Sequence, residues 1–570
     1  MNSHQLPVAL LTRSFALVLI SLAVACGSSS SVPETDGGGG GGGGSGSTAS
    51  SGTTVGSGIA GSGSGSAFPG TGMGSGSSGA GVAPPEAGIS GDDGAASSGG
   101  TGALADAGPI AESGAPPETG VVNSPGDGGV GWGSVPGILA RIVPPTFPNV
   151  DCDVTKYGGN GDGVTDNTAA FAAAIADCVA KGGGRVVAPA GTFFTGPIEL
   201  KSNINLYVAA GATIRFTTDP AKYLPPVEVS WEGSLAQNYR PLIWAHDATN
   251  VAITGTGTID GNASKSNWYQ WLQLQKTDQG NLRQQDANGV PPAQRIYGAG
   301  HYLRPGLIEF MRCTNVLFDG FTAMNSPFWT IHPVLSKNIT ARNFRSVSDI
   351  TVVNTDGFDP ESCTDVLIQN ASIQVGDDAV AIKAGRDRDA MTYYKPSENI
   401  VIQKSTMLST WGGVTIGSEM SGGVRNVYVE DCTFSSAAGN LIYGFFIKSA
   451  VTRGGYIHDI YARNITVGTV RTFLYLTGHY VAGAVIGPTN FASFDNINID
   501  MATVARTSQQ PFFIAGSDAS KPANGIHLSN ITVNASAAPA LAAGSGHYQN
   551  LTTTNVTVNG SPFSPPASAP

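Results

Sequence analysis

The sequence lacks the features that membrane-spanning, nucleic-acid-binding and metal proteins need. Its apolar run at residues 15–23 is too short to span a bilayer as a permanent helix, and no later segment qualifies. The net charge is −11, so there is no basic stripe to neutralise the phosphates of a nucleic acid. No histidine and cysteine cluster has metal-ligand spacing, and there is no glycine-rich phosphate loop. We therefore expect no nucleic-acid partner, no metal and no cofactor.

Residues 1–26 have the pattern of an export signal. A short segment ending at Arg13 precedes the apolar run, and Ala23-Val24-Ala25-Cys26 forms a small-residue cleavage site. A cysteine at this place, followed by Gly27 and Ser28, resembles a bacterial lipobox, which implies an acylated Cys26. The alternative is an ordinary secretory signal with an incidental cysteine. Either reading predicts an exported protein at the outer surface or outside the cell, and in the first reading the lipid at Cys26 is its one membrane attachment.

Residues 27–140 are dominated by glycine, serine, alanine and proline. Such a segment buries too little apolar surface to offset its conformational entropy, so we predict a disordered tether. A flexible chain of this length reaches roughly 50–60 Å, enough to hold a working domain clear of a membrane.

Residues 145–562 repeat a short phrase, a polar turn residue followed by a β-rich run. The phrase occurs at Thr249-Asn250, Thr314-Asn315, Lys337-Asn338, Thr364-Asp365, Glu398-Asn399, Arg425-Asn426, His458-Asp459, Gly525 and Gln549-Asn550. Asn315 and Asn338 are 23 residues apart, and loops lengthen other intervals. A period in the low twenties, rich in valine and isoleucine, is typical of a β-solenoid. We predict one all-β domain, a parallel β-helix of about ten coils.

The start of this domain differs from the repeat. Residues 166–180 have apolar side chains at helical spacing behind a capping-type Asp-Asn-Thr, which predicts a helix that caps the first coil. Cys152 and Cys178 bracket this segment and are a candidate disulfide in an oxidising compartment. Cys313 and Cys363 precede the same repeat position in separate coils, so we expect them to pack in the interior.

The densest group of acidic residues is Asn354-Thr355-Asp356 together with Gly376-Asp377-Asp378. Asp356 and Asp377 are 21 residues apart, about one coil, so the spacing stacks these carboxylates in space. Clustered carboxylates repel one another, which raises at least one pKa and keeps a proton available. Glycosidic cleavage needs one protonated carboxyl and one carboxylate that activates water. The alternative is that these aspartates cap turns or form a solvated ladder.

These motifs resemble those of the polygalacturonase family of glycoside hydrolases. The resemblance rests on Asn354-Thr355-Asp356, Gly376 to Lys383, Gly412 to Glu419, Ser326 to Pro333 and Arg453-Gly-Gly, in order along the solenoid. It implies a right-handed parallel β-helix and an inverting hydrolase of pectin-type chains. Asp377 is then the general acid, and Asp356 and Asp378 hold and activate the water. An inverting pair is expected about 6.5–9.5 Å apart.

The sequence departs from the family at two places. The family's Gly-His-Gly is here Thr410-Trp411-Gly412, and its Arg-Ile-Lys is here Phe446-Ile447-Lys448. An arginine that would meet a uronate carboxylate is thus replaced by an apolar ring, and Trp411 and Phe446 offer faces on which a sugar can stack. We predict a neutral, esterified or deoxy sugar at this subsite. The expected substrate-binding residues are Lys448, Trp411, Phe446, Asn354 and Arg453.

Other residues have weaker signals. Trp268, Tyr269 and Trp271 begin an insertion that ends near Tyr302; it either closes one end of the groove or packs its own aromatics. His332 is interpreted as a buried, hydrogen-bonded histidine rather than a catalyst. Arg386 and Arg388 either border the groove or are solvated. Two further functions stay open: a lyase acting on uronates, and a surface protein that binds carbohydrate without cleaving it. We expect a monomer whose partner is a polysaccharide.

Overall fold

A computed structural model describes residues 131–570, apart from 437–438, 440 and 482–484. The predicted export signal, Cys26 and the tether up to residue 130 lie outside the described residues. Among those described, no helix is long and apolar enough to cross a membrane.

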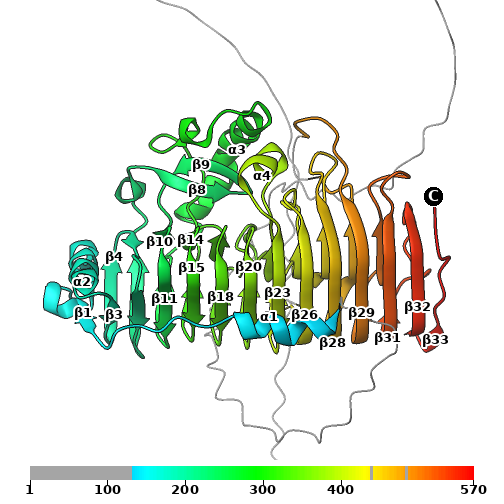
Figure 1. The fold of residues 1–570 in the computed structure, drawn as a ribbon, viewed down its shortest axis with the longest axis horizontal. Coiled ribbons are helices and arrows are strands. Elements are labelled where there is room, and N and C mark those ends of the chain that lie inside the picture. The colour runs from blue at the N-terminus through cyan, green and yellow to red at the C-terminus, as the bar shows by residue number, and fades with distance from the viewer. Residues whose placement is uncertain (1–130, 437–438, 440, 482–484) are drawn as a thin grey trace, which may run out of the picture. The chain divides into compact units, whose positions relative to one another are not determined.

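The strands form successive coils of a parallel β-helix, so the predicted fold class is confirmed (Figure 1). Each strand pairs with the strand one coil away, which gives three ladders. The first ladder contains β1 (Asp151–Asp153), β3 (Gly184–Ala188), β6 (Ile204–Val208), β11 (Thr249–Gly255), β15 (Thr314–Asp319), β18 (Lys337–Arg342), β20 (Thr364–Gln369), β23 (Ser397–Gln403), β26 (Val424–Ser435), β28 (Tyr456–Thr477), β29 (Ser493–Thr507), β31 (Ala523–Ala535) and β32 (Tyr548–Val558). A short antiparallel strand, β33 (Ser561–Pro562), follows β32.

The second and third ladders complete each coil. The second contains β2 (Asp162–Asp166), β4 (Gly191–Thr195), β7 (Ala212–Phe216), β12 (Thr258–Asp260), β16 (Thr322–Met324), β19 (Arg345–Val347), β21 (Ser372–Val375) and β24 (Thr406–Ser409). The third contains β5 (Ile198–Glu199), β10 (Ile243–His246), β14 (Ile308–Met311) and β17 (Ile331–Val334), and, after single bridges through Glu361, β22 (Val380–Ile382), β25 (Gly412–Ile416), β27 (Leu441–Lys448), the end of β28 and β30 (Phe512–Ala515).

The repeat found in the sequence is the register of the first ladder. Thr249 pairs with Thr314, Thr314 with Lys337, and Lys337 with Thr364. The asparagine or, after Thr364, the aspartate that follows each of these residues has a left-handed backbone, with φ of 56° at Asn250 and 57° at Asn315 and Asp365. Asparagine tolerates this conformation, which turns the chain into the strand. The Asn315 amide donates to Asn250 Oδ1 at 2.9 Å, so the turn residues also bond from coil to coil.

The interior is a stack of apolar side chains, one or more from each coil. Val251, Val316, Ile339, Val366 and Ile400 share one register position and are fully buried. Burying each such side chain contributes about 1.5–3 kcal/mol. Cys313, Cys363 and Cys432 are buried free thiols, as expected for Cys313 and Cys363.

The first coil is capped by helix α2 (Thr168–Ala180), as predicted. Asp166 accepts a hydrogen bond from the Thr168 backbone at 3.0 Å, and Phe171, Ala174 and Ile175 face the core. The predicted disulfide of Cys152 and Cys178 is wrong, because the structure has both as free, buried thiols. The Cys152 thiol donates instead to Asp177 Oδ2, and the Cys178 thiol to the carbonyl of Arg185.

The end of the predicted tether is folded. Residues 132–141 form a 3₁₀ turn (Trp132–Ser134) and helix α1 (Val135–Arg141), which cross the outside of the first ladder (Figure 1). The apolar side chains of this segment pack on Val401, Tyr428 and Tyr461, and Arg141 pairs with Asp365 at 2.6 Å. The boundary at residue 140 is therefore too late, because a few apolar residues are enough to anchor this segment to the coils.

Insertions between the ladders build a cover over the third ladder. It consists of η3 (Pro220–Tyr223), β8 (Val227–Trp231), β9 (Ser234–Asn238), η4 (Trp268–Gln270), α3 (Trp271–Ala287), η5 (Pro292–Gln294), β13 (Ile296–Tyr297) and α4 (Asp387–Tyr393). A buried ion pair between Arg295 and Asp389, 2.8 Å apart, joins the segment after α3 to α4. The 3₁₀ turn η2 (Val154–Tyr157) follows β1.

Candidate active site

Asp356, Asp377 and Asp378 come together at the start of the third ladder. Asp356 follows β19, and Asp377 and Asp378 connect β21 to β22 in the next coil. The glycine beside each acidic motif lets the two coils approach. A Cβ at Gly376 would lie 2.3 Å from the carbonyl oxygen of Val352, and one at Gly357 would lie 2.6 Å from that of Ala379. Any other residue would push the coils apart here.

One carboxylate oxygen from each of the three aspartates lies within 4.8 Å of the others. The predicted stacking is therefore confirmed, but the separation of about 6.5–9.5 Å expected for an inverting pair is wrong for these oxygens. Adjacent coils are only about 4.8 Å apart, and the side chains come from adjacent residues and adjacent coils. Oxygens this close could also hold a metal ion between them.

Each carboxylate is held by a different contact. The Asn354 backbone donates to Asp377 Oδ2 at 2.7 Å, and the Lys448 ammonium donates to Asp378 Oδ2 at 3.2 Å. The Lys383 ammonium lies 3.8 Å from Asp356 Oδ2. Among the described residues, Asp356 Oδ1 and Asp378 Oδ1 are buried and have no hydrogen-bond partner. Two acceptor atoms in the cluster are therefore open to a ligand.

Burial and mutual repulsion hold a proton in this cluster. Burial, then the charge of Asp378, raises the pKa of Asp377 to about 6. Burial, then the charge of Asp377, raises the pKa of Asp356 well above its usual value. The raised pKa values of Asp356 and Asp377 mean that the cluster still holds a proton in mildly acidic solution.

Lys448 lies between the carboxylate of Asp378 and the aromatic rings of Phe446 and Tyr480. Burial would lower the pKa of its ammonium, but the charges of Asp378, Tyr480 and Asp377 together outweigh burial, so the pKa is raised. The ammonium sits 4.3 Å from the ring centre of Phe446 and 4.8 Å from that of Tyr480. A cation over an aromatic face is stabilised by the ring quadrupole. Lys448 is thus fixed and stays charged.

Phe446 is not a surface for stacking sugars, which corrects the expectation from the sequence. Its side chain is 1% exposed and is packed against Tyr443, Tyr475 and Tyr480, beneath Lys448. These neighbouring rings leave no room beside Phe446 for a sugar ring. Trp411, the other substituted position, does line the pocket.

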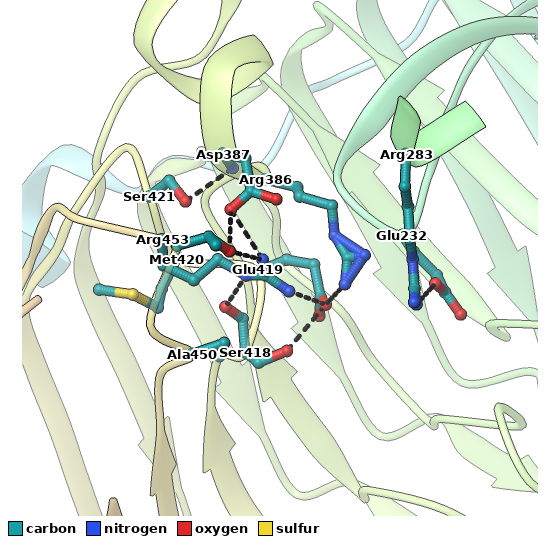
Figure 2. A network of polar contacts seen from close by, with 12 residues as sticks. Glu232, Arg283, Arg386, Asp387, Ser418, Glu419, Met420, Ser421, Ala450 and Arg453 are labelled. Carbon is teal, nitrogen blue, oxygen red and sulfur yellow. Dashed lines mark hydrogen bonds and ion pairs between the residues drawn. The ribbon is translucent and has the colours of Figure 1, made fainter. Parts of the chain in front are cut away.

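Arg453 is also not part of the pocket lining. Its guanidinium donates to Ser418 O at 2.9 Å and to Asp387 at 2.7 Å, and lies 3.7 Å from Glu419 (Figure 2). Arg386 likewise donates to Glu419, at 3.2 Å. Burial alone would raise the pKa of Glu419, but Lys383, Arg386 and Arg453 lower it below its usual range. Both arginines therefore lie outside the pocket lining and hold Glu419 in its place within that lining.

The pocket contains more residues than the sequence indicated. Its lining consists of Glu232, Arg283, Trp329, Val353, Asn354, Asp356, Asp377, Asp378, Lys383, Trp411, Ser418, Glu419, Lys448 and Tyr480. Trp329, Lys383, Ser418 and Glu419 lie within motifs that carry the family resemblance, so that signal was available. Glu232, Arg283 and Tyr480 come from segments outside these motifs. Asn354 lies in the lining with its side-chain oxygen bonded to Arg304 at 3.0 Å.

Two other predictions can be compared with the structure. His332 is buried between Glu309 and Glu361, 3.0 Å from Glu361, as the interpretation of a hydrogen-bonded histidine expected. Trp268 and Tyr269 are buried too, and Trp268 packs on Trp271 with ring centres 4.8 Å apart. The aromatics of the insertion therefore support its own fold, and the insertion contributes Arg283 to the pocket lining instead.

The model of glycosyl hydrolases family 28 matches residues 178–555, most of the β-helix. The chain belongs to this family. Among family 28 relatives, a "Probable polygalacturonase" of Vitis vinifera is 34% identical over 404 residues, which cover 67% of this chain and 74% of the relative.

Solved structures of the family have the same fold. An exopolygalacturonase from Thermotoga maritima superposes with a TM-score of 0.67 at 35% identity, covering 75% of this chain and 96% of that one. A family 28 exopolygalacturonase from Yersinia enterocolitica superposes with a TM-score of 0.58 at 22% identity, covering 72% and 76%. This family 28 chain is therefore a glycoside hydrolase, and the three aspartates lie in the pocket lining of its β-helix.

Proposed function

We propose that this family 28 protein is a hydrolase of pectin-type polysaccharides that inverts the anomeric carbon, with the attacking water held among the clustered aspartates rather than across a gap of about 6.5–9.5 Å. Asp377 carries the proposal, because it is half-buried in the pocket lining with a pKa of about 6 and lies beside two other carboxylates. A carboxyl of this kind is still protonated in mildly acidic solution and can donate its proton to a leaving oxygen. The polygalacturonases among the relatives support the substrate class.

In the proposed reaction, the Asp377 proton passes to the glycosidic oxygen as the bond from that oxygen to the anomeric carbon breaks. A water held by Asp356 and Asp378 attacks the same carbon from the other side and gives its proton to one of these carboxylates. Two acceptors within 4.8 Å can share one water, because each hydrogen bond to it is about 2.7–2.8 Å long. The charges of Lys383 and Lys448 oppose the burial that raises the pKa of Asp356, and the Lys448 ammonium also donates to Asp378 at 3.2 Å.

Release of reducing ends from polygalacturonate, with no product absorbing in the ultraviolet, tests the hydrolytic assignment. The expected first product has the opposite anomeric configuration from the substrate, which proton NMR follows at early times. Unsaturated, absorbing products would show a lyase instead. Binding without any cleavage across a panel of pectic polysaccharides would favour the non-catalytic alternative.

The sugar beside the cleaved bond is proposed to be neutral, esterified or deoxy. Arginine is missing at position 446, and the pocket is lined by five carboxyl side chains but only three cationic ones, Arg283, Lys383 and Lys448. An unpaired uronate carboxylate would meet like charges there. Comparing polygalacturonate with methyl-esterified pectin and a rhamnose-containing backbone at equal concentration tests this. Faster cleavage of unmodified polygalacturonate would contradict it.

A further inference from the structure

Arg304 is a fully buried arginine in the segment between β13 and β14, which joins the cover to the third ladder. Its guanidinium donates to Gln275 Oε1 at 2.9 Å, to the carbonyl of Pro327 at 2.9 Å and to Asn354 Oδ1 at 3.0 Å. All three acceptors are neutral. Because a guanidinium is planar and its N–H groups point in fixed directions, these three bonds leave one position for the group.

The backbone and the side-chain face of Arg304 are held as well. Its carbonyl oxygen accepts from Trp231 Nε1 at 3.1 Å, and its guanidinium carbon lies 5.2 Å from the ring centre of Phe328. Phe328 stacks on Trp231 and on Trp329, with ring centres 5.0 and 5.1 Å apart. A cation over an aromatic face is stabilised by the ring quadrupole. Arg304 is thus anchored to the β8–β9 hairpin and to an aromatic stack that ends at Trp329 in the pocket lining.

Asn354 connects this arginine to the proposed proton donor. Its side-chain oxygen accepts from Arg304, and its backbone N–H donates to Asp377 Oδ2 at 2.7 Å. Asn354 lies in the irregular segment between β19 and Asp356, with a φ of 58°, so it belongs to no strand whose backbone bonds would fix it. The contact with Arg304 therefore sets the direction of the N–H group that meets Asp377.

The charge of Arg304 also acts on the aspartates. Burial lowers the pKa of its guanidinium to about 10, so the group is still charged at neutral pH. The groups whose charges oppose this effect of burial are Glu232, Tyr269, Asp377 and Asp356. Attraction between two charges is mutual, so Arg304 favours the ionised form of Asp377. The other charged groups that act on Asp377 are Asp356, Asp378, Lys448 and Lys383.

We propose that Arg304 is a positioning residue for catalysis: it holds Asn354 so that the Asn354 N–H stays on Asp377 and keeps that carboxyl in the orientation from which it protonates the leaving oxygen. The inference rests on the proposed hydrolytic function. Arg304 is 0% exposed and lies outside the pocket lining, so it acts on the reaction without touching the substrate. Loss of its side chain then lowers turnover more than it weakens substrate binding.

Kinetics of Arg304→Gln and Arg304→Lys on a short pectic oligosaccharide, followed from about pH 4 to 8, test this role. In Arg304→Gln, kcat should fall about 10- to 100-fold while KM changes by less than about threefold, because a small displacement of a catalytic group is costly. The alkaline decline in rate should move to higher pH by about 0.5–1 unit, since Asp377 loses a nearby positive charge and a fixed N–H donor. Arg304→Lys retains a cation but not the three bonds, so kcat should fall while the decline moves less.

Arg312→Gln is the matched control. Arg312 follows β14, pairs with Glu228 on β8 and lies outside the pocket lining, so it is another arginine that links the cover to the third ladder. Its replacement should lower the thermal unfolding temperature without changing kcat or the pH profile.

Several outcomes would overturn the inference alone: a folded Arg304→Gln variant with an unshifted pH profile, or a loss of activity that lies in KM rather than kcat. If Arg304→Gln does not fold, Arg304→Lys decides, and a wild-type kcat in that variant would overturn the inference. A wild-type protein that releases no reducing ends from any pectic substrate would overturn the proposed function instead.

Discussion

Replacing Asp377 with asparagine removes the proposed proton donor with little change in shape. General acid catalysis typically contributes 10²–10⁴-fold in rate, so we expect kcat to fall by about that factor. This corresponds to roughly 3–5 kcal/mol of barrier. The side-chain oxygen of asparagine can still accept from the Asn354 backbone, as Asp377 does at 2.7 Å. The second acceptor, which takes the Asp378 N–H at 2.9 Å, becomes an amide and loses that bond.

The cost in stability is therefore small compared with the loss in rate. One hydrogen bond contributes about 0.5–1.5 kcal/mol, and removing a buried, partly ionised carboxyl offsets part of this cost. A thermal unfolding curve should show a shift of a few degrees at most. Asp365→Asn is the control, since it makes the same substitution in a turn where neighbouring coils have asparagine and where the pocket is not involved.

The pH dependence separates a proton donor from a group that only fills space. With a pKa of about 6, Asp377 is about nine-tenths protonated at pH 5 and about one-tenth at pH 7. The wild-type rate should fall about tenfold between these values, and the variant should not show this decline. Turnover of Asp377→Asn within tenfold of the wild type, or an unchanged alkaline decline in the variant, would refute the role given to Asp377.

Three further predictions follow from the same contacts. Lys448→Met should lower kcat/KM about 10- to 100-fold, because the hydrogen bond of the ammonium to Asp378 is lost. The Lys448 charge also lowers the pKa of Asp377, so its removal should shift the alkaline decline in rate to higher pH. An unshifted pH profile would contradict this. Burial, then the charges of Asp389 and Asp387, raises the pKa of Asp286 from 3.8 to about 7. The folded state therefore binds this proton more tightly than the unfolded state does, and stability is lost as pH rises from about 4 to 7. Thermal unfolding of Asp286→Asn should show a smaller loss over this range, and an unfolding temperature that falls with pH as steeply as in the wild type would argue against this. If Cys26 carries lipid, the full-length protein expressed in a bacterium should fractionate with membranes and Cys26→Ser should be soluble, whereas a soluble wild type with unmodified Cys26 would favour plain secretion.

The sequence predicted the register of the repeated strands and the residues that lie side by side in adjacent coils. The register from Thr249 to Thr314 and the proximity of Asp356 to Asp377 both follow from a periodic backbone with one strand spacing. The orientation of Phe446 and Arg453 depends on side chains of neighbouring coils and loops, such as Tyr480 and Asp387, which no period specifies. Both residues matched positions of a family motif, yet one is covered by aromatic rings and the other by acidic partners.

The rest of the site could not be predicted because it comes from irregular segments. Glu232 and Asp378 are far apart in the sequence and line the same pocket only because the β8–β9 hairpin folds over the third ladder. The turn Trp231-Glu232-Gly233 contains no feature that distinguishes it from other turns. Residues 132–141 had the composition of a tether at their start, but the buried side chains of Val135 and Ile138 on one short helix, and of Ile142 just after it, were enough to bind the segment to the coils.

The ladder of the β-helix tolerates very unequal loops. Thr249 pairs with Thr314, which is 65 positions further along the chain, and Thr314 with Lys337, which is 23 positions further, yet both pairs keep the same register. The backbone hydrogen bonds between coils therefore do not depend on the length of the loops that connect the strands. Natural selection can lengthen or replace the cover without changing the register of the coils that carry the aspartates. Exchange of these insertions can then alter the part of the pocket that the cover supplies, whereas a change of chemistry requires new residues on the coils themselves.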